Sequence, residues 1–315
     1  MDQEKDTSLL VDLAQDYYLR HLNLGEIAKK YNISRYKISK YLNEAIEKNI
    51  VTITINSPFA RSHDLENKFK QFFPNPNFYI LKNTEDIAHE DDRFYSFAAK
   101  YLQNLIKGKK IIGLTWGDTI YHVIDSFQSV PKENMVFTQF VGENGKHNSL
   151  AGSMRMVQKV AVRYNGTYLT IDAPLYIANK EVRRLLALEP AIQPTLATAQ
   201  QLDLIFTSVG TIDSINSVNS WYNSEDILFP KINPNSIAAL VYGRPIDKDG
   251  NLLIDNEHDK VFGISFKKTM EVPTRVAIVN DKFKFLALKA ALNGNYFTDV
   301  ILNEPTANKV LAELE

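Results

Sequence analysis

Six polar residues at the start of a predicted helix have side chains that can contact DNA. Guanidinium and hydroxyl groups can hydrogen-bond to base edges, while lysine side chains and a helix N-terminus can contact phosphates. A helix that presents such groups on its first turns fits the major groove. We therefore predict DNA binding at Ser34, Arg35, Tyr36, Lys37, Ser39 and Lys40.

Positive charge is concentrated around these residues and is absent from the chain as a whole. Between Arg20 and Lys48 there are seven basic residues against three acidic ones, a local charge of +4, whereas the net charge of all 315 residues is −1. The pattern indicates a local phosphate-facing surface and excludes a general basic field.

Two helices must position this surface. Apolar residues at helical spacing predict a first helix over Leu24 to Tyr31, and Asn32-Ile33 predicts a tight turn. Ser34 can cap a second helix that buries Ile38, Leu42 and Ala45/Ile46. The residues from Thr7 to Arg20, with Leu9, Leu10, Leu13, Tyr17 and Tyr18 on the apolar side, predict a leading helix that completes a three-helix core.

An ordinary helical hairpin with a solvated basic face is the alternative, and it is the commoner outcome for any helix pair. The short turn, the serine cap and the clustered basic residues together favour a DNA-binding helix-turn-helix. The β-branched run Asn49 to Ile55 predicts a strand, and Asn56-Ser57-Pro58 predicts a domain boundary. We expect a helix-turn-helix domain over residues 1–56 and a second, larger domain over residues 57–315.

The second group of chemically useful residues lies in three loops that follow predicted strands. Small residues let backbone N–H groups converge on a ligand, and the following helix N-terminus favours negative charge. Such loops also need turn residues for purely structural reasons, so only their recurrence favours a sugar or phosphate site. The loops are Thr115-Trp116-Gly117-Asp118-Thr119, Gly142-Glu143-Asn144-Gly145 and Ser208-Val209-Gly210-Thr211.

Individual residues near these loops have two interpretations each. Asp118 and Asp172 can accept hydrogen bonds from sugar hydroxyls, although aspartate near a helix start is also an ordinary cap. Lys284 follows a strand and can reach the same edge of the sheet, although an exposed lysine is more often only solvated. Trp116 can form the floor of a pocket, but filling the core is its commoner role.

The elements that would carry these loops alternate between strands and helices, which predicts an α/β fold with a largely parallel sheet and helices on both faces. Ligands bind at the carboxyl ends of strands in such sheets. Strands are expected over 78–81, 110–114, 135–141, 168–171, 202–209, 275–279 and 299–302. Helices are expected around Leu65–Phe72, 94–105, 119–127, 154–162 and 282–292, and from Pro305.

The sequence lacks the motifs that are typical of several classes of enzymes and metal-binding proteins. The chain has no cysteine, no His-x-x-x-His pair, no Gly-x-Ser-x-Gly elbow and no Walker-type loop. Asp247-Lys248-Asp249-Gly250 resembles the start of a calcium loop but lacks the later ligands, so we interpret it as a hairpin turn. We expect no catalytic residue, metal or cofactor. The polar start and the lack of a long apolar run predict a cytoplasmic protein without a membrane partner.

The order of these features resembles the SorC family of sugar-binding bacterial transcriptional regulators along nearly the whole chain. The most specific match is Ile112-Gly113-Leu114-Thr115-Trp116-Gly117-Asp118-Thr119. Further matches are Glu26-Ile27-Ala28, Ile33-Ser34-Arg35, Ile38-Ser39-Lys40, Gln139-Phe140-Val141-Gly142, Asp203 to Gly210, Asp247-Lys248-Asp249-Gly250 and Thr306-Ala307.

The resemblance implies a Rossmann-like effector domain similar to sugar-phosphate isomerases and glucosamine-phosphate deaminases, without their catalysis. It implies three partners: double-stranded operator DNA, a sugar or sugar-phosphate effector, and further copies of the chain in a homodimer or homotetramer. The implied effector-binding residues are Thr115, Trp116, Gly117, Asp118, Thr119, Gly142, Glu143, Asn144, Asp172, Gly210, Thr211 and Lys284, the last as a phosphate contact.

The chain departs from the family pattern at three places. Val141 stands where one branch has a Schiff-base lysine, so a covalent aldehyde adduct is not expected there. Ala239-Leu240 replaces a Gly-Asp pair and removes an acidic ligand for hydroxyls. Asn280-Asp281 replaces a Gly-Gly pair before Lys284, and Asp281 would oppose a phosphate.

These observations together predict a transcriptional regulator of carbohydrate metabolism whose operator affinity is controlled by its effector. One alternative is a sugar-phosphate isomerase or deaminase with an accessory helical head, for which Asp118, Glu143 or Asp172 would serve as base. The other is a constitutive DNA-binding protein with a vestigial effector domain.

Overall fold

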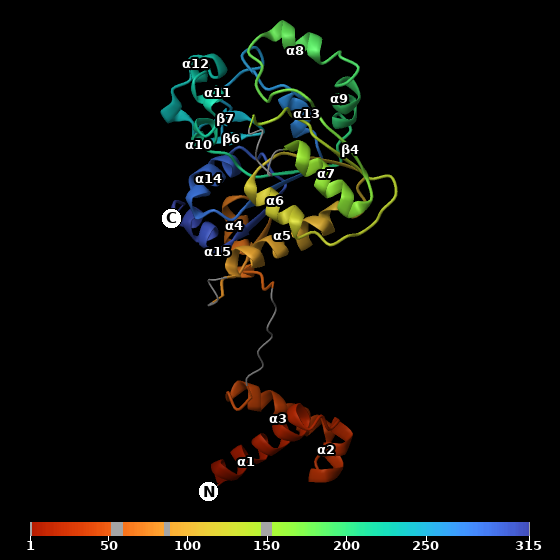
Figure 1. The fold of residues 1–315 in the computed structure, drawn as a ribbon. Helices are drawn as coiled ribbons and strands as arrows, with labels where there is room; N and C mark the ends of the chain where they lie inside the picture. Colours follow the sequence, from red (N-terminus) through yellow and green to blue (C-terminus); the bar gives the residue numbers. More distant parts are fainter. Residues whose placement is uncertain (1, 52–58, 85–88, 146–152, 315) are drawn as a thin grey trace. The chain divides into compact units, whose positions relative to one another are not determined.

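The computed structural model describes residues 2–51, 59–84, 89–145 and 153–314. The chain divides into two compact units, Met1–Ser57 and Pro58–Glu315. Figure 1 shows a small helical unit at the N-terminal end of the chain and a larger unit built around a sheet. The predicted boundary Asn56-Ser57-Pro58 lies outside the described residues.

The first unit is built from helices, in chain order α1 (Asp2–Ala14), the π-helix η1 (Gln15–Leu19), α2 (Leu24–Tyr31) and α3 (Arg35–Glu47). Its core contains Leu13 from α1, Ile27 from α2, and Ile38 and Leu42 from α3, all buried. Each helix therefore contributes its apolar face to one small core, and the outer face of α3 stays free of it.

Local side-chain bonds fix the ends of α2 and α3. The Asn23 side chain accepts hydrogen bonds from the amides of Gly25 and Glu26, and Glu26 accepts the amide of Asn23 in return. Asn32 ends α2 in the left-handed region at φ 55°. The Ser34 hydroxyl accepts the amide of Lys37 at the start of α3, as the sequence predicts.

A buried carboxylate ties the leading helix to α2. Asp16 has no exposed surface, and its two oxygens accept hydrogen bonds from Arg20 at 2.7 Å, Lys30 at 2.6 Å and the hydroxyl of Tyr31 at 2.9 Å. The hydrogen bond from Lys30 is the largest influence and, with those from Tyr31 and Arg20, lowers the pKa of Asp16 from 3.8 to about 2, against the opposing effect of burial.

Three details predicted for this N-terminal unit (Met1–Ser57, called the head below) are wrong. The described part of the predicted strand, Asn49 to Val51, forms a turn, because Asn49 adopts φ 55° and the amides of Ile50 and Val51 both bond to the carbonyl of Ala45. The rest of that strand lies outside the described residues. Tyr17 and Ile46 are each 38% exposed, whereas Leu10, Leu13 and Ala45 are buried.

The second unit contains a seven-stranded sheet in the order β1-β9-β8-β5-β2-β3-β4, and every neighbouring pair is parallel. This confirms the predicted α/β class with a parallel sheet. The strands are β1 (Asn77–Leu81), β2 (Ile111–Leu114), β3 (Val136–Thr138), β4 (Thr167–Leu169), β5 (Leu204–Thr207), β8 (Thr274–Val279) and β9 (Asp299–Asn303).

Helices cover both faces of this sheet, as predicted, and alternate strand residues show which face each one covers. Ile205 and Ala277 pack with α4 (His63–Phe72), α14 (Phe285–Asn293) and α15 (Glu304–Ala312). Phe206 and Val276 pack with α5 (Glu90–Ile106), α6 (Asp118–Asp125) and α7 (Ser153–Tyr164) on the other face. Figure 1 shows α5, α6 and α7 side by side, and α14 next to α15.

A second, two-stranded sheet was not predicted. Strands β6 (Ala239–Val241) and β7 (Arg244–Ile246) form a hairpin whose two turn residues, Tyr242 and Gly243, both have positive φ. Leu240 pairs with Gly210, which joins the hairpin to the loop after β5. A tyrosine at the first turn position hides the usual sequence signal for such a turn.

Short helices complete the unit between the strands. They are α8 (Lys180–Leu186), α9 (Gln193–Ala199), α10 (Ile212–Asn216), α11 (Asn219–Tyr222), α12 (Glu225–Leu228), α13 (Phe266–Met270) and the 3-10 segments η3 (Pro234–Ser236) and η4 (Lys282–Lys284). In the part of the chain that is described, no helix has both the length and the apolar character needed to cross a membrane.

The predicted element boundaries differ from the observed ones by a few residues. The strands predicted over 135–141 and 202–209 are shorter, because the polar loops that follow them begin within the apolar runs. Phe72 is 45% exposed, and Phe73 takes its expected place in the core. Asp247 to Gly250 form a turn, since Asp247 accepts the amides of Asp249 and Asn251 and Ile246 pairs with Leu252.

Candidate functional site

The strand order reverses direction between β5 and β2. After β2 the chain adds β3 and β4 on one side, and it then returns to place β5, β8 and β9 on the other. Loops that leave neighbouring strands in opposite directions open a crevice at the carboxyl ends of those strands. The crevice in this sheet is therefore expected after Leu114 and Thr207.

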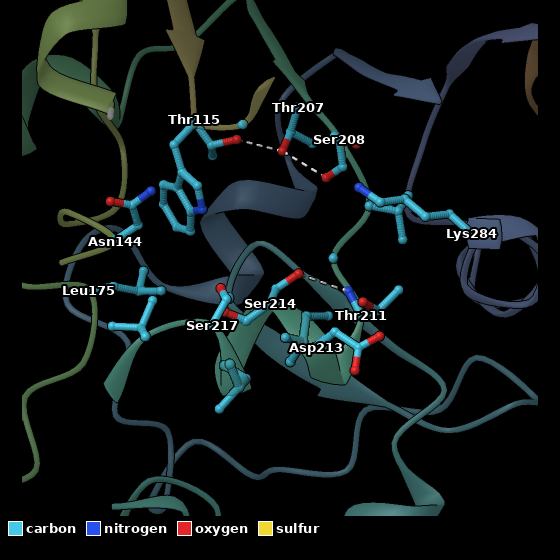
Figure 2. Close-up of a pocket in the computed structure, with 18 of the residues that line it drawn as sticks. Thr115, Asn144, Leu175, Thr207, Ser208, Thr211, Asp213, Ser214, Ser217 and Lys284 are labelled. Carbon is cyan, nitrogen blue, oxygen red and sulfur yellow. Dashed lines mark hydrogen bonds between the residues drawn. The ribbon is translucent and has the colours of Figure 1, made fainter. Parts of the chain in front are cut away.

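Two buried threonines mark this point. The Thr115 and Thr207 hydroxyls are 2.6 Å apart, and the Thr207 hydroxyl also donates to the carbonyl of Ser208. Figure 2 shows this pair along one side of a pocket, with the Lys284 side chain extending toward Ser208. The hydrogen bond links the ends of the two strands and fixes the pocket wall.

A cavity of about 420 Å³ lies at the crevice, in the size range of small-ligand sites. Its walls come from the ends of β2, β5 and β8, from the β6–β7 hairpin and from the segment around Tyr176. Eight of the predicted effector residues line it, and they are Thr115, Trp116, Gly117, Asp118, Asn144, Gly210, Thr211 and Lys284.

Four predicted effector residues do not line this cavity. The Thr119 hydroxyl donates to Asn280 and thereby joins α6 to the loop after β8. A side chain oxygen of Glu143 accepts from Gln139, and Asp172 is exposed outside the cavity. These three residues hold or flank the walls.

Gly142 is the fourth, and its role in the structure is close packing. A Cβ atom at this position would lie 2.5 Å from the carbonyl oxygen of Pro174 and 2.7 Å from that of Ala173. The amide of Glu143 donates to the carbonyl of Ala173, so the loop after β3 runs directly against residues 173–175. The glycine therefore positions the loop that carries Asn144.

Lys284 is the basic residue of the described cavity lining. Burial lowers the pKa of its ammonium group, and the carboxylates of Asp281 and Asp118 oppose that shift. Desolvation is the larger effect. The Lys284 side chain is partly buried, and its ammonium group would gain from a polar ligand group that accepts its hydrogens.

Trp116 has both of the roles considered for it. The side chain is partly buried and packs against the hydrophobic clusters on both faces of the sheet, and it also lines the cavity. Its position directly after β2 accounts for this, because a residue at a strand end can contact both faces.

Several residues that line the cavity were not predicted from the sequence. Asp213, Ser214 and Ser217 follow Gly210-Thr211 along the chain, so the polar run after β5 carried a local signal for them. Tyr176, Trp221 and Tyr242 come from distant segments that tertiary packing brings together, and no local pattern marks them.

The positions at which the chain departs from the family pattern lie at or near the cavity. Val141 is buried and outside the lining, while Leu240 and Asp281 both line the cavity. The Asn280 side chain is held by hydrogen bonds within the protein: it accepts one from Thr119 and donates to Tyr95 and Asp91. In the residues the structure covers, no group of three or more acidic or histidine side chains is arranged to hold a metal ion.

The six residues predicted to contact DNA share one exposed surface on α3 and its cap. Tyr36 is 83% exposed, whereas Ile38 between them is fully buried. The guanidinium of Arg35 lies over Gly25, since a Cβ atom there would be 3.0 Å from it. Ser34, Lys37, Ser39 and Lys40 are all exposed beside them.

A parallel α/β sheet with a ligand-sized cavity at its switch point defines a ligand-binding α/β protein. A family model described as "Putative sugar-binding domain" matches residues 57–312, which is most of the chain. The chain belongs to this family, that of the SorC-type sugar-binding transcriptional regulators.

Individual relatives are similar over their full length. The deoxyribonucleoside regulator of Bacillus subtilis (strain 168) is 23% identical over 320 residues, covering all of both chains. The sorbitol operon regulator of Klebsiella pneumoniae is 23% identical over 99% of this chain and 100% of its own. The crystal structure of full-length SorC from Klebsiella pneumoniae has a TM-score of 0.69 at 24% identity, covering 98% of this chain and 99% of that one.

Proposed function

We propose that this protein is a DNA-binding transcriptional regulator of carbohydrate metabolism whose operator affinity is controlled by a sugar or sugar phosphate in the cavity. The observation that carries the proposal is the cavity at the switch point, which gathers eight residues predicted from the sequence alone. Relatives named as regulators of deoxyribonucleoside and sorbitol genes support the same function.

The proposal assigns one task to each unit. Residues 1–56 form a helix-turn-helix domain in which α3 enters the major groove, and residues 57–315 form an effector domain similar to sugar-phosphate isomerases and deaminases. The exposed surface on α3, with Arg35, Lys37 and Lys40, supplies the contacts to bases and phosphates. Action on operator DNA places the protein in the cytoplasm.

Regulation would follow from a shift between two states of the effector domain. A ligand that binds one state more tightly increases the population of that state. If the protein is a homodimer or homotetramer, such a shift changes the spacing of paired α3 helices relative to half-sites on the operator. The cavity binds its ligand without turnover in this mechanism, in keeping with relatives that are named as regulators.

The DNA-binding part is tested with Arg35→Ala and Lys37→Ala. Each variant removes an exposed cation from α3, so operator affinity should fall by about fivefold or more and the salt dependence should become less steep. Lys68→Ala is the matched control, because Lys68 is exposed on α4 in the other unit. Fluorescence titration at several salt concentrations measures both quantities, and unchanged affinity and slope would show that α3 does not contact DNA.

The absence of turnover is tested separately. Purified protein is incubated with a panel of sugar phosphates, and the mixtures are followed by NMR. We expect the spectra to stay constant over hours. Isomerised or deaminated product at a rate above the protein-free control would assign the cavity to an enzyme.

A further inference from the structure

We propose that the effector of this cavity is an uncharged sugar or polyol, because three aspartates lie at the helix starts where a phosphate would bind and one of them already accepts a backbone amide there. The inference rests on the proposed function in one respect, since it concerns the same cavity. It goes further by naming the chemical class of the ligand.

Three helix starts open on the cavity, and each carries its own aspartate. Asp118 is the first residue of α6, Asp213 lies in the first turn of α10, and Asp281 is the N-cap of η4. Free amides at the start of a helix attract an anion. A carboxylate in the first turn places a negative charge beside these amides, and Asp281 also accepts one of them.

Asp281 shows this most directly. Its side chain accepts the amide of Phe283 at 2.8 Å, so the first free N–H of the segment before Lys284 is already bonded to a carboxylate. At α10 the amide of Thr211 is likewise bonded to the Ser214 hydroxyl. A phosphate group would have to displace these internal acceptors.

The charges around the cavity also oppose a phosphate. In the described lining, three carboxylates accompany one ammonium group, that of Lys284. A sugar phosphate carries between one and two negative charges at neutral pH, and each carboxylate within a few ångströms repels it. Lys284 alone does not offset three such repulsions.

Neutral hydroxyl groups fit the same lining well. The carboxylates of Asp118 and Asp213 make no hydrogen bond to any other residue that the structure describes, so they can accept from ligand hydroxyls. Lys284 can donate to a hydroxyl oxygen, and the buried Oγ atom of Ser208 has no partner in the described structure. Trp116 and Trp221 add apolar surface for the C–H face of a sugar ring.

The first experiment uses inorganic phosphate as the probe and does not depend on knowing the sugar. Phosphate binding to full-length protein is measured by isothermal titration calorimetry in a chloride background, for the wild type, D281N and D249N. Asparagine can still cap the segment through its side chain oxygen, and Asp249 is exposed outside the cavity.

We expect no measurable phosphate binding to the wild type or D249N. D281N should bind phosphate with an affinity at least tenfold above the weakest that the titration detects. This gain should disappear when Lys284→Met is added, which would locate the phosphate in the cavity. Phosphate binding by the wild type that Lys284→Met removes would overturn the proposal. So would equal phosphate affinities of the wild type and D281N.

The second experiment compares matched pairs of a free sugar or polyol and its phosphate, such as ribose with ribose 5-phosphate and glucitol with glucitol 6-phosphate. At least one free compound should bind the wild type at least tenfold more tightly than its phosphate, and D281N should reduce that ratio. A wild-type preference for any phosphorylated member overturns the inference but leaves sugar-controlled regulation intact. If no carbohydrate of either kind binds, the proposed function fails, and the phosphate titration still decides the role of Asp281.

Discussion

Asp16 and Lys284 are ionisable residues whose surroundings shift their pKa, and each makes a different kind of contribution. Asp16 is fully buried with Arg20, Lys30 and Tyr31 as its donors, so it stabilises the head. Lys284 is partly buried and has no hydrogen bond or ion pair with any other residue that the structure describes, so it is available to a ligand. Burial alone does not distinguish these roles, but the presence or absence of satisfied hydrogen bonds does.

Replacing Asp16 by asparagine should make the stability of the head less dependent on pH. The folded pKa is about 2 against an ordinary 3.8, so the charged form stabilises the fold above about pH 4. That contribution declines as the pH falls from about 4 toward 2. At pH 7 we expect Asp16→Asn to cost about 1–3 kcal/mol.

Hydrogen exchange of full-length protein, read at the amides of α1, α2 and α3, measures this difference. The difference in unfolding free energy between wild type and variant should become smaller below about pH 4. Asp12→Asn on the same helix is a control, since Asp12 is exposed. A gap that stays constant from pH 3 to pH 7 would show that the charge of Asp16 does not stabilise the head.

Effector affinity should fall as the pH rises toward the lowered pKa of Lys284. Burial favours the neutral amine, so the ammonium group loses its proton at a lower pH than the ordinary 10.5. Calorimetric titrations of the sugar found in the panel, at a series of pH values up to the ordinary pKa of 10.5, should show binding that weakens progressively before that value is reached. Lys284→Arg keeps its charge over this range, so its affinity should not change with pH. Equal pH profiles of the two proteins would exclude Lys284 as the titrating group.

Among the elements, those that follow local rules were predictable and those that depend on distant contacts were not. The α3 cap, the apolar strands and the polar loops after β2 and β5 each carry their signal within a few residues. The β6–β7 hairpin depends on positive φ at Tyr242, which gives no such signal. The turn at Asn49 is local, but the β-branched residues that follow it favoured a strand. Loop composition likewise suggested a ligand role for Gly142, where the structure shows close packing against Pro174.

Gly142→Ala should therefore disturb the loop after β3. The added methyl would lie 2.5 Å from a backbone oxygen, so residues 173–175 or the loop must move. We expect a loss of about 1–3 kcal/mol in unfolding free energy and weaker ligand binding, because Asn144 moves with the loop. Chemical denaturation and calorimetry measure the two effects. Gly108→Ala is the comparison, since a Cβ atom there meets nothing within 4 Å, although its φ of 82° adds backbone strain of its own.

If Gly142→Ala is no more destabilising than Gly108→Ala, the close contact with Pro174 is not a constraint in solution. If Gly142→Ala is destabilised but binds ligand normally, the loop does not control the position of Asn144. Both results are accessible from the same purified proteins.

At the scale of the whole molecule, the two compact units have separate hydrophobic cores. The change in the sequence from helical patterns to alternating strands and helices predicts this division into two domains. It cannot show which strand ends meet, because the order β1-β9-β8-β5-β2-β3-β4 arises only when the chain folds. The sequence predicted the loops that contribute to the cavity, but it did not predict all of the residues that line it.

Separate cores predict separate unfolding. Differential scanning calorimetry of the full-length protein should resolve two unfolding transitions. A bound sugar should raise only the midpoint temperature of the transition that belongs to the unit from Pro58 to Glu315. Operator DNA should raise only the midpoint temperature of the transition that belongs to the head. A single transition that both ligands shift equally would mean that the units unfold as one cooperative body.

The pairing of β1 with β9 also sets an order in time. Asn77 donates to Asp299 across 222 residues of chain, so one edge of the sheet cannot form until its last strand has left the ribosome. The described core of the head joins residues that lie between Leu9 and Val51, so it can fold well before β9 is made. Each newly made chain would then carry the surface of α3 that we propose contacts DNA before its effector domain is complete, and the interval between the two is set by the rate of translation.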